Sequence, residues 1–179
     1  VTDKVVPNIV GVDIGCGMEV VFLKEQELDL ERLDKAIHAL IPAGAKIHDF
    51  PVTSFDFDTL HCKGNVNLER ALRSIGTLGG GNHFIEVDRT EAGELVLVIH
   101  SGSRQLGSDV ASYYGDQAYR YQCRKQRKRV RQSYYDDVDA GGFVSNKSSG
   151  SSVQVKRETA VLEGALLKEY LHDLDVVVS

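Results

Sequence analysis

The chain has 179 residues, of which 42% are hydrophobic and 26% are charged, so it is long enough for one domain with a sizeable core. Its net charge of −5 excludes a general attraction of the whole molecule to nucleic acid, and a polyanion would need a local basic patch. No apolar run reaches the length of a membrane span, and no signal peptide opens the chain, so we expect no membrane partner. The three cysteines are far apart, which favours a reducing compartment, and we expect the cytoplasm.

The spacing of apolar residues predicts an α+β fold with mixed β-sheets and flanking helices. In chain order, the predicted elements are a strand (5–12), a strand (20–23), a helix (29–40), a loop with a short turn (45–64), a helix (67–75), two strands (84–87 and 95–99), a helix (108–131), a flexible Gly/Ser-rich loop (140–152) and a helix (158–172). We expect residues 1–179 to form a single domain. We also expect it to be part of a longer chain, because the sequence starts with Val1 and stops just after an apolar run.

Three glycine-rich blocks carry residue types that bind metals. The first block, residues 11–18, contains Asp13 and Cys16. The second block contains His83, and the third ends an apolar strand with His100. A carboxylate, a thiol and two imidazoles can hold a divalent transition metal, and glycine turns allow the close backbone approach that phosphate chemistry requires. Each block alone is also typical of a structural role, but three of them at strand ends favour a metal site.

Further polar residues lie beside these candidate ligands. Asn82 can donate a hydrogen bond to a phosphate oxygen. Glu86 can contact a bound ligand or orient the imidazole of His83. Arg104 follows His100 closely and offers a guanidinium that suits phosphate. The glycine run before His83 is not a Walker loop, because no Gly-Lys-Ser/Thr follows it.

The remaining histidines carry weaker signals. His61 and Cys62 are adjacent, and adjacent side chains on an extended chain point apart. We therefore interpret His61, His38, His48 and His172 as structural or exposed. The basic run over residues 124–131 is typical of a solvated helix face, and contact with RNA phosphates is the alternative.

The three blocks resemble the RtcB family of RNA ligases in their order and spacing, over about the first 110 residues. This resemblance implies an RtcB-like fold and the joining of RNA ends that carry a 2′,3′-cyclic phosphate or a 3′-phosphate to 5′-hydroxyl ends, in tRNA splicing and RNA repair. It implies GTP and manganese as cofactors and a guanylylated histidine as intermediate. Zinc also suits a site of cysteine and histidine.

The resemblance also implies roles for individual residues. By position, Cys16 would bridge two manganese ions, His83 and His100 would complete the first metal site, and Asp13 would bind the second ion. Asn82 and Glu86 would contact the guanylate.

The family takes another metal-binding histidine and the guanylylated histidine from its C-terminal half. After His100 this chain has only His172, whose surroundings match neither motif, so we identify no catalytic nucleophile. We therefore interpret the chain as the N-terminal portion of an RtcB-like ligase, inactive alone. The alternatives are a metal-dependent phosphoesterase and a non-catalytic RNA-binding remnant.

Overall fold

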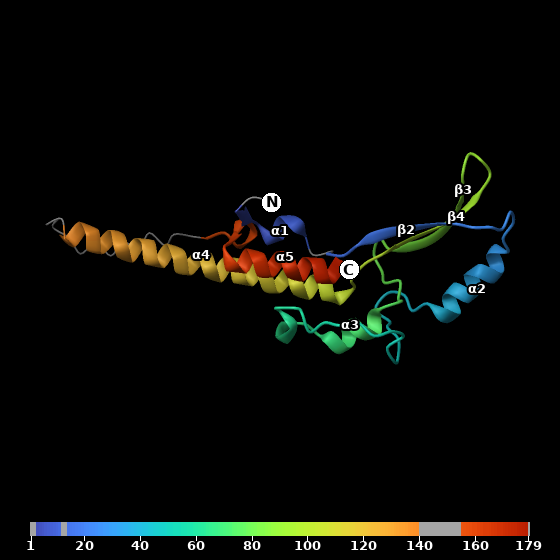
Figure 1. Cartoon of the computed structure of the whole chain (residues 1–179), viewed down its shortest axis with the longest axis horizontal. Coiled ribbons are helices and arrows are strands. Elements are labelled where there is room, and N and C mark those ends of the chain that lie inside the picture. The colour runs from blue at the N-terminus through green and yellow to red at the C-terminus, as the bar shows by residue number, and fades with distance from the viewer. Residues whose placement is uncertain (1–2, 12–13, 140–154, 179) are drawn as a thin grey trace. The chain divides into compact units, whose positions relative to one another are not determined.

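The structure is a computed structural model that describes residues 3–11, 14–139 and 155–178 (Figure 1). The chain divides into two compact units. The helical unit comprises Val1–Gly11 and Ala111–Tyr170, and the sheet unit comprises Val12–Val110 and Leu171–Ser179. The expected single domain over residues 1–179 stays a prediction, and the loop expected over residues 140–152 lies outside the described residues.

The predicted α+β class is confirmed by the order of the elements. They are β1 (Lys4–Val5), α1 (Pro7–Val10), β2 (Gly17–Phe22), α2 (Leu30–Leu40), the 3-10 turn η1 (Lys63–Asn65), α3 (Leu68–Ser74), β3 (Phe84–Arg89), β4 (Leu95–Ser101), α4 (Gln105–Asp139), the 3-10 turn η2 (Arg157–Thr159), β5 (Leu162–Glu163) and α5 (Ala165–Val178). Within the described ranges, no helix is both long and apolar enough for a membrane span.

The sheet unit is built on three strands in the order β2-β4-β3. Both strand pairs are antiparallel rather than part of the mixed sheet that we expected, and a parallel bridge occurs only between Ala43 and Gly79 among the described residues. Because β4 is central, His100 has a neighbour on each side, Met18 on β2 and Phe84 on β3. Paired residues share a face of the sheet, so the end of β4 is held from both sides.

Two predicted helices of the sheet unit are confirmed, and their first residues explain where they begin. The carboxylate of Asp29 accepts a hydrogen bond from the backbone N–H of Arg32 (2.9 Å) before α2. The side chain of Asn67 accepts one from the N–H of Arg70 (3.0 Å) before α3. These capping bonds satisfy N–H groups that have no partner within the helix.

The helical unit corrects two predictions. The strand expected over residues 5–12 ends at Val5, because Pro7 starts α1, where a missing N–H costs nothing. The helix expected over residues 158–172 is interrupted by β5, which pairs with β1, and by Gly164 at φ +64°. The helix α5 then begins at Ala165. Fully buried side chains in this unit include Tyr114, Ala118, Leu162 and Tyr170.

Candidate metal centre

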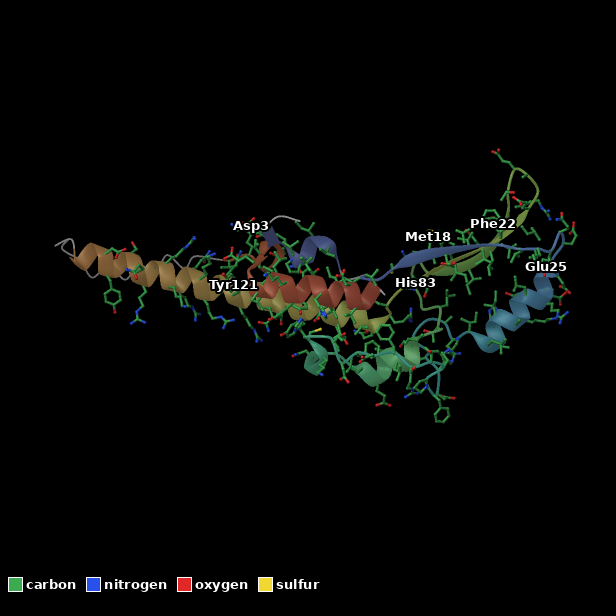
Figure 2. The ribbon with its side chains drawn as sticks, viewed as in Figure 1. Asp3, Met18, Phe22, Glu25, His83 and Tyr121 are labelled. Atoms are coloured by element: carbon green, nitrogen blue, oxygen red, sulfur yellow. The ribbon has the colours of Figure 1, made fainter. Side chains whose placement is uncertain are left out.

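The structure brings Cys16, His83 and His100 together, and we call these residues the Cys16 cluster. One ligand atom from each lies within 4.8 Å of the others. The distance from Cys16 Sγ to His83 Nε2 is 3.3 Å, and the two imidazole rings are 5.3 Å apart at 79°. Cys16 precedes β2, His83 precedes β3 and His100 lies in β4, so the sheet register places the cluster (Met18 and His83 are labelled in Figure 2).

Two glycines leave the space that this cluster needs. A Cβ atom at Gly102 would lie 2.5 Å from Cys16 Sγ and 3.4 Å from His83 Nε2. Gly79 has φ +88°, and a Cβ there would lie 2.6 Å from His83 Nδ1 and overlap the guanidinium of Arg104. Side chains at either position would push the ligand atoms apart, which is the physical reason for glycine in these two blocks.

The imidazole of His100 is oriented for binding a cation. Its Nδ1 lies 3.0 Å from the backbone carbonyl of Asn82. A carbonyl only accepts, so Nδ1 carries the proton and donates it, and the lone pair stays on Nε2. A backbone acceptor of this kind is the usual partner of a metal-binding histidine.

His83 has a different partner, the guanidinium of Arg104. Arg104 Nη1 lies 3.3 Å from His83 Nδ1, and a guanidinium only donates, so Nδ1 accepts and the proton sits on Nε2, facing Cys16. A cation bound through Nε2 requires the other tautomer, with the proton on Nδ1, so Arg104 would have to turn away from this nitrogen when a metal binds.

The surroundings of Arg104 disfavour the charged form of its guanidinium. Burial lowers the pKa of the guanidinium, the nearby charge of Arg70 lowers it further, and Cys16 opposes both. Arg104 Nη2 donates to the carbonyl of Gly44 (2.6 Å), while the buried Nε has no hydrogen-bond partner among the described residues. The result is a cation with spare donor capacity next to the Cys16 cluster.

The other predicted site residues have separate outcomes. Asp13 lies outside the described residues, and its role as a ligand stays a prediction. Asn82 and Glu86 are exposed. Glu86 lies two residues from Phe84, so it shares the sheet face of His100. Glu86 was predicted either to orient the imidazole of His83 or to contact a bound ligand. No hydrogen bond joins Glu86 to His83 in the described part of the chain, so contact with a bound ligand is the role that stays a prediction.

Sequence reasoning missed a second group, His61, His172 and Asp173, which we call the Asp173 cluster. One ligand atom from each lies within 4.8 Å of the others. The expectation that His61 and Cys62 point apart is correct, since His61 is exposed and Cys62 is fully buried. Burial raises the pKa of Cys62 to about 12, helped by a hydrogen bond to Asp173. No sequence pattern links the loop around His61 to α5, so only the tertiary structure shows this cluster.

Comparison with known proteins identifies the family. Residues 54–140 match the family model of the tRNA-splicing ligase RtcB. The RNA-splicing ligase RtcB of Escherichia coli K12 is 31% identical over 137 residues, which cover 64% of this chain. The tRNA-splicing ligase RtcB of Nanoarchaeum equitans is 24% identical over 204 residues, which cover 83% of this chain and 42% of that protein. Over part of its length, the chain belongs to the RtcB family.

The matches extend over only part of this chain and of its relatives. The match spans about a third (34%) of the length of the Escherichia coli relative. The family model includes His83 and His100, begins after Cys16, and continues past the 110 residues of the sequence resemblance into the basic part of α4. The chain therefore covers less than half of the length of either ligase to which it is similar.

Proposed function

We propose that this chain supplies the metal-binding part of a GTP- and manganese-dependent RtcB ligase, which joins 2′,3′-cyclic phosphate or 3′-phosphate RNA ends to 5′-hydroxyl ends. The observation that carries the proposal is the convergence of Cys16, His83 and His100 from three separate strand ends. Family membership supplies the reaction class, because the matched relatives are named as RNA-splicing and tRNA-splicing ligases.

The donor set fits a divalent transition metal. A thiolate and two imidazoles bind zinc readily, and the choice of manganese rests on the resemblance. A bound ion of this kind polarises a phosphoryl group and stabilises the attacking and leaving oxygens. The proposed ligands are Cys16, His83 and His100, with Asp13 serving a second ion.

The remaining residues would bind and orient the phosphate-bearing substrate. Arg104 lies next to His83, and a guanidinium is the side chain that matches phosphate oxygens best. The exposed side chains of Asn82 and Glu86 are proposed to contact the guanylate. None of these residues is placed as the group that takes up GMP, which in this proposal lies elsewhere in the complete ligase.

The proposal is tested by incubating the purified chain with labelled GTP and Mn²⁺ and by measuring bound metal. We expect metal to bind and no covalent GMP adduct to form. A stable labelled adduct would contradict the assignment of the nucleophile to another part of the ligase. A chain that binds no divalent metal would contradict the proposal itself, and hydrolysis of a phosphate ester without GTP would favour the phosphoesterase alternative.

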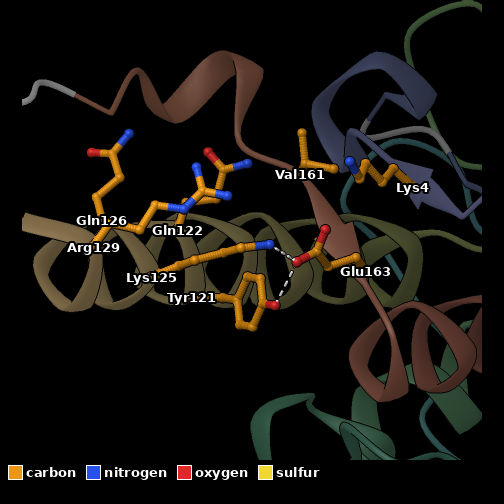
Figure 3. Close-up of a pocket in the computed structure, with 8 residues that line it drawn as sticks. All are labelled: Lys4, Tyr121, Gln122, Lys125, Gln126, Arg129, Val161 and Glu163. Atoms are coloured by element: carbon orange, nitrogen blue, oxygen red, sulfur yellow. Dashed lines mark hydrogen bonds and ion pairs between the residues drawn. The ribbon is translucent and has the colours of Figure 1, made fainter. Parts of the chain in front are cut away.

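A cavity in the helical unit favours RNA binding as a second candidate function. The cavity, of about 230 Å³, lies between α4, β1 and β5 and is drawn in Figure 3. Three cationic side chains line it, Lys4, Lys125 and Arg129, against one carboxylate, Glu163. Glu163 accepts hydrogen bonds from Lys125 and from the hydroxyl of Tyr121. The excess positive charge is local, in a chain whose net charge is −5.

RNA binding through this cavity predicts a strong dependence on salt, because each neutralised phosphate releases counterions. The test is fluorescence anisotropy of a labelled single-stranded RNA at increasing ionic strength, with the chain and with its Cys16→Ala variant. We expect both proteins to bind with the same salt slope. Binding that disappears in Cys16→Ala would contradict a separate RNA site in the helical unit.

A further inference from the structure

We propose that His61, His172 and Asp173 form a second metal site, which takes a divalent transition ion of the zinc class. All three residues belong to the sheet unit, His61 from the loop before η1 and the other two from α5. One ligand atom from each lies within 4.8 Å of the others. The site shares no residue with the Cys16 cluster, so the inference does not rest on the proposed ligase function.

The carboxylate of Asp173 fixes the geometry of this site. Asp173 is fully buried, and its Oδ1 and Oδ2 accept hydrogen bonds from the backbone N–H groups of His61 (2.8 Å) and Cys62 (3.0 Å). These two bonds hold the His61 loop against α5. Oδ1 also lies next to His172 Nδ1, so a cation between these two atoms would take the place of the imidazole proton as the partner of the carboxylate.

The imidazole rings of His61 and His172 lie close together. Their ring centroids are 4.9 Å apart at 67°, and His172 Nδ1 lies 3.3 Å from Asp173 Oδ1. The side chain of His172 is 46% exposed, so a cation can enter from solvent while the buried carboxylate supplies the negative charge. Two imidazoles and a carboxylate form a set that zinc accepts with a fourth position left for water.

An ion at this site would crosslink two segments of the sheet unit that are distant in sequence. His61 and Asp173 are 112 positions apart in sequence. Closing a long loop with a metal gives a large entropic stabilisation, and an ion that binds only the folded state raises the unfolding temperature. The expected role of the ion is therefore structural, and its effect is measured by zinc binding together with the unfolding temperature.

The test is equilibrium dialysis of Zn²⁺ against the Cys16→Ala chain, in which the Asp173 cluster is the remaining proposed site. We expect about one Zn²⁺ per chain and a rise in unfolding temperature on zinc addition. The added substitutions His172→Ala and His61→Ala should each weaken zinc binding at least about tenfold, since each removes one ligand. Circular dichroism checks that each variant is folded.

His38→Ala is the matched control. His38 Nδ1 also lies 3.3 Å from an aspartate oxygen, Asp34 Oδ1, but among the described residues no second histidine completes a cluster there. Zinc binding should be unchanged by this substitution. An equal loss in His38→Ala and His172→Ala would indicate binding by any exposed histidine and would overturn the proposal.

Two further results would also overturn it. One is the absence of zinc from folded Cys16→Ala chain, and the other is full zinc affinity in both His61→Ala and His172→Ala. If Cys16→Ala does not fold, the zinc stoichiometry is measured in the wild-type chain instead, with and without His172→Ala. There His172→Ala should lower the bound zinc from about two ions per chain to about one, and an unchanged stoichiometry would count against the site.

Discussion

The sheet unit and the helical unit hold chemical groups of different kinds. In the sheet unit, metal-type ligands lie at positions fixed by strand register, by glycines without Cβ atoms and by bonds to the backbone. In the helical unit, the cavity is lined mainly by long Lys, Arg and Gln side chains from α4. Rigid ligands make binding depend on single atoms, whereas flexible cations give graded binding that falls with salt. Substitutions should therefore separate the two activities.

The largest expected effect comes from Cys16→Ala. Removal of the sulfur takes away one of the three converging ligands, so metal affinity at the Cys16 cluster should fall at least about 100-fold. Isothermal titration calorimetry measures this affinity. The control is Cys123→Ala, because Cys123 lies on α4 in the helical unit. Equal metal affinity in the two variants would contradict the assignment of this metal site to the sheet unit.

Gly79→Ala should have the next largest effect. The backbone at φ +88° disfavours alanine, and the new Cβ would collide with Arg104 and with His83 Nδ1. We expect a loss of about 1–2 kcal/mol in unfolding free energy and a metal affinity about tenfold weaker.

Gly93→Ala is its matched control, because Gly93 has φ +87° and a Cβ there meets nothing within 4 Å. That variant should lose similar stability in urea unfolding and keep its metal affinity. If both variants lose affinity equally, general destabilisation explains the effect and the close packing at Gly79 does not.

A charge reversal in the helical unit should act on RNA alone. Arg129→Glu is expected to weaken binding of single-stranded RNA about threefold to tenfold and to reduce the salt slope by about one to two, with metal affinity unchanged. Lys35→Glu makes the same change of charge on exposed α2 in the sheet unit and should have little effect. Equal losses in these two variants would point to net charge rather than to the cavity.

The smallest expected effect is an acid dependence of the helical unit. Hydrogen bonds from Lys125 and then Tyr121 lower the pKa of Glu163. Because the folded-state pKa is the lower one, this contribution to stability is present above the unfolded pKa of about 4.3 and is lost as pH falls through the folded value. Urea unfolding from about pH 6 to pH 3 should show the stability difference between the chain and Glu163→Gln shrinking with acid. A difference that stays constant over this range would contradict the lowered pKa.

The sequence predicted elements whose signals are local. Helical spacing of apolar residues located α2 and α3, and an unbroken apolar run located β4. The errors arose where one residue overrides a pattern, as Pro7 does for the first strand and Gly164 does for the last helix.

The same limit applies to the two clusters. The Cys16 cluster was predictable, because its ligands end strands next to glycines and those strands pair. The Asp173 cluster was not, because a loop without periodicity has to lie against α5 before His61 reaches His172. That placement depends on tertiary packing, which no pattern in residues 45–64 reports.

The most direct measurement is a Co²⁺ titration of the chain, followed by the thiolate-to-metal charge-transfer absorption. We predict a band that saturates at about one Co²⁺ per chain, disappears in Cys16→Ser, and is weakened or shifted in both His83→Ala and His100→Ala. The Asp173 cluster contributes no such band, since it contains no sulfur. A band that survives Cys16→Ser, or is unchanged in both histidine variants, would show that the three side chains do not bind one ion together.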